Sequence, residues 1–144
     1  MLKGVPKIIS PDLMLALMEM GHGDEIVLAD ANFPSETCGQ RVIRCDGHPM
    51  PELLDAILQF LPLDSFVPAP VALMDAPDYV PEIWAVYEEI VKKHEEESNK
   101  FEYIERFEFY DRSKEAFAVV ATGEEALYGN IILKKGVIKS TNNV

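Results

Sequence analysis

The chain has 144 residues, of which 48% are hydrophobic and 26% are charged, and its 25 acidic and 13 basic residues give a net charge of -12. This composition excludes a disordered or fibrous chain, and the length fits a single domain over residues 1–144 with a sizeable core. The acidic balance argues against nucleic acid and anionic membranes as partners, because both need clustered lysine and arginine. A neutral ligand is compatible with it.

No apolar run approaches the roughly 20 residues that span a bilayer. The N-terminus lacks the apolar region and small-residue cleavage site of a signal peptide, so we expect a cytoplasmic protein. Cys38 and Cys45 fit neither a CxxC motif nor a disulfide framework, and we expect them to be plain thiols in a reducing compartment. Too few residues have suitable spacing for a four-ligand zinc site, so no metal is expected.

The first predicted element is a helix over residues 11–20. Ser10 is a suitable N-cap, and Pro11 can occupy the first turn, where its missing N–H leaves no bond unmade. Leucine and methionine recur on one face, which predicts packing against a core. We expect Gly21 to end the helix, because glycine tolerates the left-handed backbone that often terminates helices.

His22 follows in a predicted turn between two glycines. Residues 26–29 are apolar and partly β-branched, which predicts a short buried strand. Asp30 falls at or just past the carboxyl end of this strand, and the ligands of open α/β sheets bind at such ends. A histidine and an aspartate so placed suggest a site, although a solvated or structural His22 also fits this stretch.

Apolar periodicity and turn signals locate the other elements. The predicted helices span residues 49–61, 81–97 and 111–116. The predicted strands span residues 41–45, 71–74, 103–110, 117–121 and 130–133, and residues 31–39 form a loop. About six strands interleaved with helices predict an α/β fold, a three-layer α/β/α sandwich around a mixed, mostly parallel sheet.

Several reaction classes lack their motifs in this sequence. There is no GxxxxGK[ST] phosphate loop, no GxGxxG after a strand and no GxSxG elbow. His48 and His94 are the only further histidines, so metal-dependent hydrolysis has little support. Asp64 can be interpreted as a plain turn residue, and His94 lies in a charged helix end that we expect to face solvent.

What remains is a set of polar side chains at predicted strand ends and turns: His22, Asp30, Asp64, Arg106, Tyr110, Tyr128 and Asn130. These groups can hydrogen-bond hydroxyls, and a histidine can give or take a proton near neutral pH. Tyr128 and Asn130 stand two positions apart on a segment that we predict to be extended, so their side chains should point the same way. The set suits a sugar site that carries out proton transfer.

Three separated blocks of the sequence resemble the L-fucose mutarotases, whose family also contains the D-ribose pyranases. The blocks are GHGDEIVLAD at residues 21–30, ERFEFY at 105–110, and FAVVATGE leading into LYGN within 117–130. The resemblance extends from Leu2 to about Val137. It implies an isomerase without metal or cofactor that interconverts sugar anomers. It also implies a ring-shaped homo-oligomer, often a decamer of stacked pentamers, in which a neighbouring subunit completes each pocket.

The resemblance also implies roles for individual residues. His22 becomes the catalytic acid/base. The sugar-lining positions are Asp30, Arg106, Tyr128, Gly129 and Asn130, with Asp64 and Tyr110 as further sugar contacts in the animal-type members. Gly23 and the block at 106–110 resemble the fucose branch more than the ribose branch.

Mutarotation suits a histidine for a chemical reason. A base removes the proton of the anomeric hydroxyl while an acid protonates the ring oxygen, and the two roles exchange when the ring closes again. A histidine, whose ordinary pKa is about 6.5, can serve in both roles. Asp30 could either orient His22 or hold a sugar hydroxyl, and the sequence leaves this open.

Two other functions remain open at this point. One is a D-ribose pyranase activity, which interconverts pyranose and furanose forms. The other is a monosaccharide-binding module, which keeps the hydroxyl-binding side chains but needs no proton donor. His22 distinguishes an enzyme from such a module.

Overall fold

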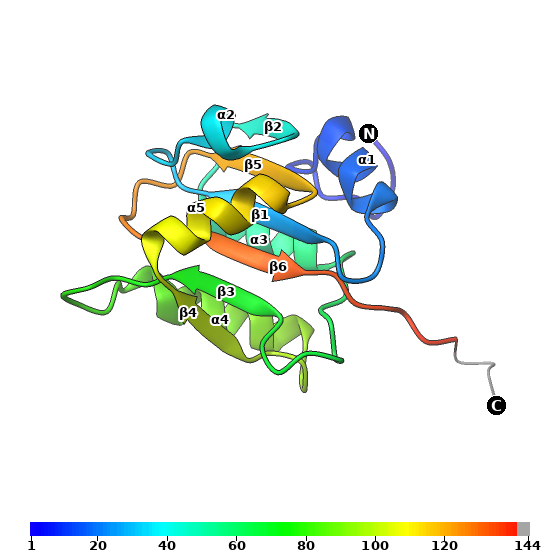
Figure 1. The fold of residues 1–144 in the computed structure, drawn as a ribbon. Coiled ribbons are helices and arrows are strands. Elements are labelled where there is room, and N and C mark those ends of the chain that lie inside the picture. The colour runs from blue at the N-terminus through cyan, green and yellow to red at the C-terminus, as the bar shows by residue number, and fades with distance from the viewer. Residues whose placement is uncertain (141–144) are drawn as a thin grey trace.

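The computed structural model of the chain describes residues 1–140, in which helices and strands alternate until the last two strands, which follow each other without a helix (Figure 1). The strands are β1 (Glu25–Ala29), β2 (Val42–Cys45), β3 (Val71–Met74), β4 (Phe101–Ile104), β5 (Ala118–Thr122) and β6 (Ile131–Lys134). The helices are α1 (Pro11–Glu19), α2 (Ser35–Cys38), α3 (Met50–Leu58), α4 (Ile83–His94) and α5 (Arg106–Glu115). Among the described residues, no helix is long and apolar enough to cross a membrane.

All six strands join one sheet in the order β2-β5-β1-β6-β3-β4. β6 is antiparallel to both of its neighbours, β1 and β3, whereas the other pairs are parallel. The prediction of a mixed, mostly parallel sheet is therefore confirmed. Because β6 runs the opposite way, its first residues lie at the same edge of the sheet as the last residues of β1 and β3.

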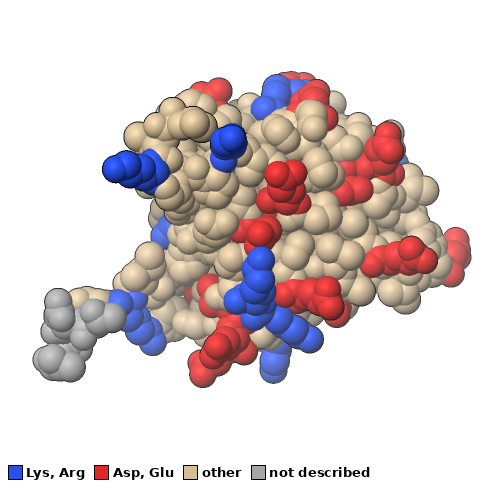
Figure 2. Space-filling view, turned by 180° about the vertical axis from the view of Figure 1, so that it is seen from behind, with Lys and Arg blue, Asp and Glu red and all other residues tan. Residues whose placement is uncertain are grey.

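Helices cover both faces of the sheet, which confirms the predicted three layers (Figure 1). Side chains alternate along β1, so that Ile26 and Leu28 join the core under α1, α3 and α4. Val27 and Ala29 join the opposite core under α2 and α5. On the face that carries α3 and α4, acidic side chains are spread over the surface and interleave with a few basic ones (Figure 2).

The prediction of a strand over residues 103–110 is wrong. The strand ends at Ile104, and α5 begins at Arg106. Alternating aromatic residues suggested a strand, but the Glu105 side chain caps a helix by accepting bonds from the N–H groups of Phe107 and Glu108. The helix then buries Phe109 and leaves Phe107 exposed, so the two aromatics do not share a strand face.

Two smaller predictions also need correction. Residues 35–38, expected to be loop, form the short helix α2. Helix α1 ends at Glu19, and of the two glycines that flank His22 the one with a left-handed backbone is Gly23, with φ of 87°, rather than Gly21. The left-handed turn therefore lies beyond His22 instead of before it.

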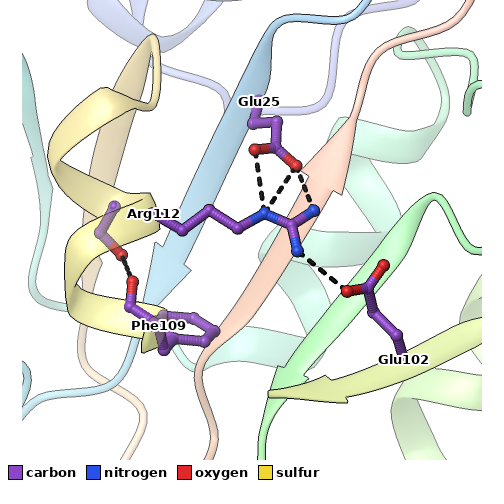
Figure 3. Close-up of polar contacts among 5 residues, drawn as sticks. Glu25, Glu102, Phe109 and Arg112 are labelled. Atoms are coloured by element: carbon purple, nitrogen blue, oxygen red, sulfur yellow. Dashed lines mark hydrogen bonds and ion pairs between the residues drawn. The ribbon is translucent and has the colours of Figure 1, made fainter. Parts of the chain in front are cut away.

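Arg112 fastens α5 to the sheet (Figure 3). Its Nε donates to Glu25 Oε1 at 3.0 Å, and its Nη2 also pairs with Glu25 Oε2. Its Nη1 lies 3.1 Å from Glu102 Oε1, so one guanidinium links β1 and β4 to the helix. The Arg112 and Glu25 side chains are mostly buried. These bonds hold α5, which also carries Arg106 and Tyr110, against the sheet.

Candidate active site

His22 lies at the edge of the sheet where β1 begins. The turn that carries it is held on both sides, because Gly23 N–H donates to the Lys135 carbonyl at 2.8 Å and Asp24 N–H donates to the Gly21 carbonyl at 3.1 Å. The His22 side chain is 44% exposed, so a ligand or a partner protein can reach its ring. The prediction that His22 sits in a turn is confirmed.

Asp64 is the polar partner of His22. Its Oδ1 lies 3.0 Å from His22 Nε2, and the same oxygen accepts a bond from Phe66 N–H. Burial raises the pKa of Asp64, but the Phe66 N–H, the His22 ring and the nearby Lys134 charge outweigh burial and hold this pKa below its ordinary value. The Phe66 ring packs against the His22 ring with centroids 5.4 Å apart. His22 is thus oriented by a buried carboxylate and an exposed aromatic ring.

The other candidate residues gather at the opposite edge of the sheet, around a cavity of about 270 Å³. This volume lies just below the roughly 300–1,000 Å³ typical of pockets for drug-sized ligands, which suits a smaller ligand. The residues that line it are Asp30, Asn32, Phe33, Met74, Arg106, Tyr110, Leu127, Tyr128 and Asn130. Five predicted residues, Asp30, Arg106, Tyr110, Tyr128 and Asn130, therefore share one cavity.

Asp30 follows β1, as predicted, and is 6% exposed. Burial raises the pKa of its carboxyl group, against the opposing effect of the hydrogen bonds from the N–H groups of Asn32, Gly129 and Phe33 and from the Asn130 side chain. Asp30 N–H also donates to Asn130 Oδ1 at 2.7 Å. The Asn130 amide oxygen is therefore occupied, and its Nδ2 donates to the Met74 sulfur at 4.0 Å, a weak acceptor that a ligand oxygen can displace.

Arg106 and Tyr110 enter the cavity from the first turns of α5. They stand one helical turn apart, and Arg106 Nε donates to the Tyr110 hydroxyl at 3.0 Å. The Arg106 guanidinium also lies over the ring of Phe107, 5.2 Å from its centroid. These residues, which we predicted to be in a strand, are therefore on a helix. The helical spacing lets the two side chains meet.

Tyr128 and Asn130 line the same cavity, but the backbone between them is not the extended segment that we predicted. Tyr128 has a left-handed backbone with φ of 56°. Gly129 contributes only its backbone and is buried. The chain turns through Tyr128 and Gly129 before β6 starts at Ile131.

His22 and the cavity do not meet within one chain. They lie at opposite ends of β1, whose five residues alone span roughly 16 Å. The carboxylate that contacts His22 is Asp64, so Asp30 of the same chain does not orient it. The pair of Asp64 and His22 and the cavity are therefore two separate groups of candidate residues within one chain.

Sequence reasoning expected an apolar patch for the methyl group of a deoxysugar, near Tyr110 or in the loop after Asp30, but it named none of the residues. Phe33 lies in that loop, three positions after Asp30, and Met74 is the last residue of β3. Leu127 precedes Tyr128 and is 60% exposed. The rule that strand ends carry sites could have found Met74, but nothing in the spacing pointed to Leu127. Among residues 1–140, no cluster of three or more His, Cys, Asp or Glu side chains could hold a metal ion.

We expect Asp64→Asn to lower the free energy of unfolding by about 1–2 kcal/mol near neutral pH, because part of a hydrogen bond to a charged group is lost. The folded state lowers the pKa of Asp64, so the carboxylate stabilises the fold above its ordinary pKa of about 3.9 and loses this effect as the pH falls through the folded-state value. The difference between wild type and variant should therefore shrink below about pH 4. Urea unfolding at several pH values measures it.

A matched control for this experiment is Asp78→Asn, which changes an exposed carboxylate. Its unfolding curve should follow that of the wild type at every pH. A constant difference between wild type and Asp64→Asn from pH 3 to pH 7 would contradict the assigned role of the Asp64 charge.

Fold and site together define a class of protein: an α/β domain with a small cavity lined by polar side chains at one edge of its sheet and an accessible histidine at the other. Residues 3–138 match the RbsD / FucU transport protein family, and the chain belongs to this family. The family match covers nearly all of the described structure, including His22 and the residues that line the cavity.

Individual relatives are similar over almost the whole chain. The fucose mutarotase of Mus musculus is 53% identical over 146 residues and covers 95% of each chain. The structure of a fucose mutarotase from Streptococcus pneumoniae in complex with L-fucose has a TM-score of 0.92 at 54% identity, and the match covers 96% of this chain and 100% of that one. RbsD of Bacillus subtilis, complexed with D-ribose, has a TM-score of 0.74 at 25% identity, with coverage of 96% and 100%.

Proposed function

We propose that this protein is an L-fucose mutarotase, a cofactor-independent isomerase that interconverts the α and β anomers of L-fucose and feeds fucose utilisation. The observation that carries the proposal is the likeness to a structure solved with L-fucose, at 54% identity over nearly the whole chain. The geometry supports the same function, because a cavity rich in hydroxyl-binding groups accompanies an accessible histidine.

The proposed reaction begins with transfer of the anomeric hydroxyl proton to a base. The bond between C1 and the ring oxygen breaks, the ring oxygen takes a proton from an acid, and C1 becomes the carbonyl carbon of an open-chain aldehyde. Rotation about the bond next to C1 and closure on the other face give the second anomer, with acid and base exchanged. His22 is the proposed proton carrier, and the buried Asp64 carboxylate holds its ring in place.

The remaining polar residues bind the sugar in this proposal. Asp30 accepts a bond from a hydroxyl, and Asn130 Nδ2 and Arg106 donate to sugar oxygens. Tyr110 and Tyr128 add hydroxyls at the cavity wall. Gly129, which stands between Tyr128 and Asn130, contacts the sugar through its backbone in this proposal. Asp64 contacts the sugar from the side of His22.

The apolar residues of the cavity fit a deoxysugar. L-fucose carries a methyl group where a hexose such as galactose carries a hydroxymethyl group. Phe33, Met74 and Leu127 provide an apolar wall on which such a methyl group can pack. This wall favours fucose over D-ribose, which has no methyl group to bury. The weaker likeness to the ribose-bound RbsD supports the same choice.

The two half-sites require two subunits in this proposal. His22, Asp64 and Phe66 of one chain would face the cavity of a neighbour. The exposed rings support such an interface, since Phe66 is 68% exposed beside His22 and Phe107 is 63% exposed beside Tyr110. A closed homo-oligomer, taken as a decamer of stacked pentamers from the family resemblance, and a cytoplasmic location are part of the same proposal.

The test is an exchange measurement on the purified protein. Magnetisation-transfer NMR should show faster exchange between the α and β signals of L-fucose than in buffer, with less acceleration for D-ribose and D-galactose. EDTA should leave the rate unchanged. Fucose exchange at the buffer rate would refute the proposed mutarotase activity. If fucose still bound, the protein would be a sugar-binding module. A larger effect on ribose pyranose–furanose exchange would support the pyranase alternative.

A further inference from the structure

The backbone at Tyr128 is strained, so contacts with other residues must stabilise its conformation. Tyr128 is the only non-glycine residue with a positive φ among residues 1–140. A side chain in this conformation crowds the following carbonyl, so it persists only where the surroundings determine it. The residue that carries the strain lines the proposed sugar cavity.

Two side chains of α4 stabilise this conformation by hydrogen bonds. Trp84 Nε1–H donates to the Tyr128 carbonyl at 3.1 Å, and the Tyr87 hydroxyl donates to the Gly129 carbonyl at 2.8 Å. Trp84 and Tyr87 stand three positions apart, so they share one face of the helix. Both are buried, Trp84 at 6% exposure and Tyr87 at 0%. The carbonyls of Tyr128, which lines the cavity, and of the residue after it are thus both bonded to one helix that lies outside the cavity.

The fit around Gly129 is tight enough to require glycine. A Cβ added there would lie 2.9 Å from the Ala126 carbonyl oxygen and 3.2 Å from the Tyr87 hydroxyl. The first contact is closer than real Cβ atoms tolerate, and the second leaves little room. Tyr87 can therefore reach the Gly129 carbonyl only because no side chain stands between them.

The same peptide segment also reaches the cavity. Gly129 N–H bonds the Asp30 carboxylate, while Asp30 N–H bonds the Asn130 side chain. A chain of hydrogen bonds therefore connects α4 to Gly129, Gly129 to Asp30, and Asp30 to Asn130. One hydroxyl outside the cavity is linked in this way to three of the residues proposed to bind the sugar.

We propose that Trp84 and Tyr87 are positioning residues for the sugar cavity, which fix Tyr128 and Gly129 in the conformation that binds the substrate. This inference rests on the proposed function and deepens it. A purely structural tyrosine in an apolar core needs no hydroxyl, since phenylalanine fills the same volume. Here the two polar atoms bond consecutive residues, one in the cavity wall and one between two of its lining residues.

The test uses isosteric variants and one matched control. Tyr87→Phe and Trp84→Phe each remove a single donor and keep an aromatic ring in the core. The control, Tyr103→Phe, removes a hydroxyl from a tyrosine that packs against Trp84 but hydrogen-bonds Glu88 instead of the loop. For each protein, the fucose exchange assay gives kcat and KM, and thermal melting reports the stability of the fold.

We expect kcat/KM to fall about three- to tenfold in Tyr87→Phe and in Trp84→Phe, which is the effect of losing one neutral hydrogen bond. The change should lie mainly in KM, because Tyr128 and Asn130 bind the sugar while His22 is not part of the linked network. The control should keep both constants. Unchanged kcat and KM in both folded variants, even with lower melting temperatures, would overturn the inference and leave the two residues a structural role.

A binding measurement separates this inference from the proposed function. Trp84 is the only tryptophan in the sequence, so its indole N–H gives a single resonance in NMR spectra of the whole protein. Adding L-fucose to the wild type should shift this resonance, and Tyr87→Phe should bind fucose about three- to tenfold more weakly. If the wild type binds fucose but does not accelerate exchange, the enzyme proposal fails and the weaker binding still supports the positioning role. Equal affinity in wild type and Tyr87→Phe refutes that role.

Discussion

His22→Ala is expected to lower the rate of anomer exchange on L-fucose by about 10²- to 10⁴-fold, the contribution of a positioned general acid/base. The reaction proceeds slowly in water without help, so the residual rate should approach that of buffer. The change removes an exposed ring whose side-chain contacts are Asp64 and Phe66, and the fold should survive it. Magnetisation-transfer NMR measures the rate, and circular dichroism checks the fold.

The sequence offers a control histidine for this experiment. His48 is exposed and lies in the turn after β2. His48→Ala should retain the wild-type rate, so a loss in both variants would indicate a general effect of histidine removal. A folded His22→Ala variant with the wild-type rate would refute His22 as the proton carrier, and the reaction would then have to use a group in the cavity such as Asp30.

Mixing two inactive variants is expected to restore activity if neighbouring chains share each pocket. His22→Ala damages one half-site, and Asn130→Ala damages the other. In mixed oligomers about one pocket in four receives an intact half from each chain, because the two halves come from different subunits and combine at random. The mixture should therefore recover roughly a quarter of the wild-type activity after joint refolding, tens of times more than His22→Ala alone.

The matched control places both substitutions in one chain and refolds it with wild type. In a one-to-one mixture, half of the His22 half-sites and half of the Asn130 half-sites are then intact. If neighbouring chains share each pocket, about a quarter of the pockets should again be intact. If every pocket were formed within one chain, the first mixture would stay inactive and the second would keep about half of the activity. The pair of mixtures thus distinguishes the two arrangements without knowledge of the oligomer size.

Much of the fold could be predicted because its signals are local. The run from Ile26 to Ala29 is apolar and ends at an aspartate, and the structure places β1 there. The segment from Tyr103 to Tyr110 failed because the choice between strand and helix depended on one cap. Glu105 bonds two N–H groups and starts α5, and the alternation of aromatics carried no information about that bond.

The candidate site could be predicted as a set of residues but not as a geometry. Asp30 and Asn130 stand one hundred positions apart, and only the antiparallel placement of β6 brings them to 2.7 Å. The pairing of His22 with Asp64 likewise depends on the β6 end, since Lys134 and Lys135 bond the backbone of both segments. Long-range pairing of this kind leaves no trace in spacing.

The reversed strand β6 has a consequence for an assembly. Asn130 stands at its beginning, and the carbonyls of Lys134 and Lys135 hold Asp64 and the His22 turn at its end. In a closed ring with shared pockets, the two ends of β6 would lie next to different sugar molecules. A strand of four residues would then act as a rigid strut between successive reaction centres. A shift of β6 by one residue would disturb two neighbouring centres at once. The register of this short strand would therefore affect activity at both of them.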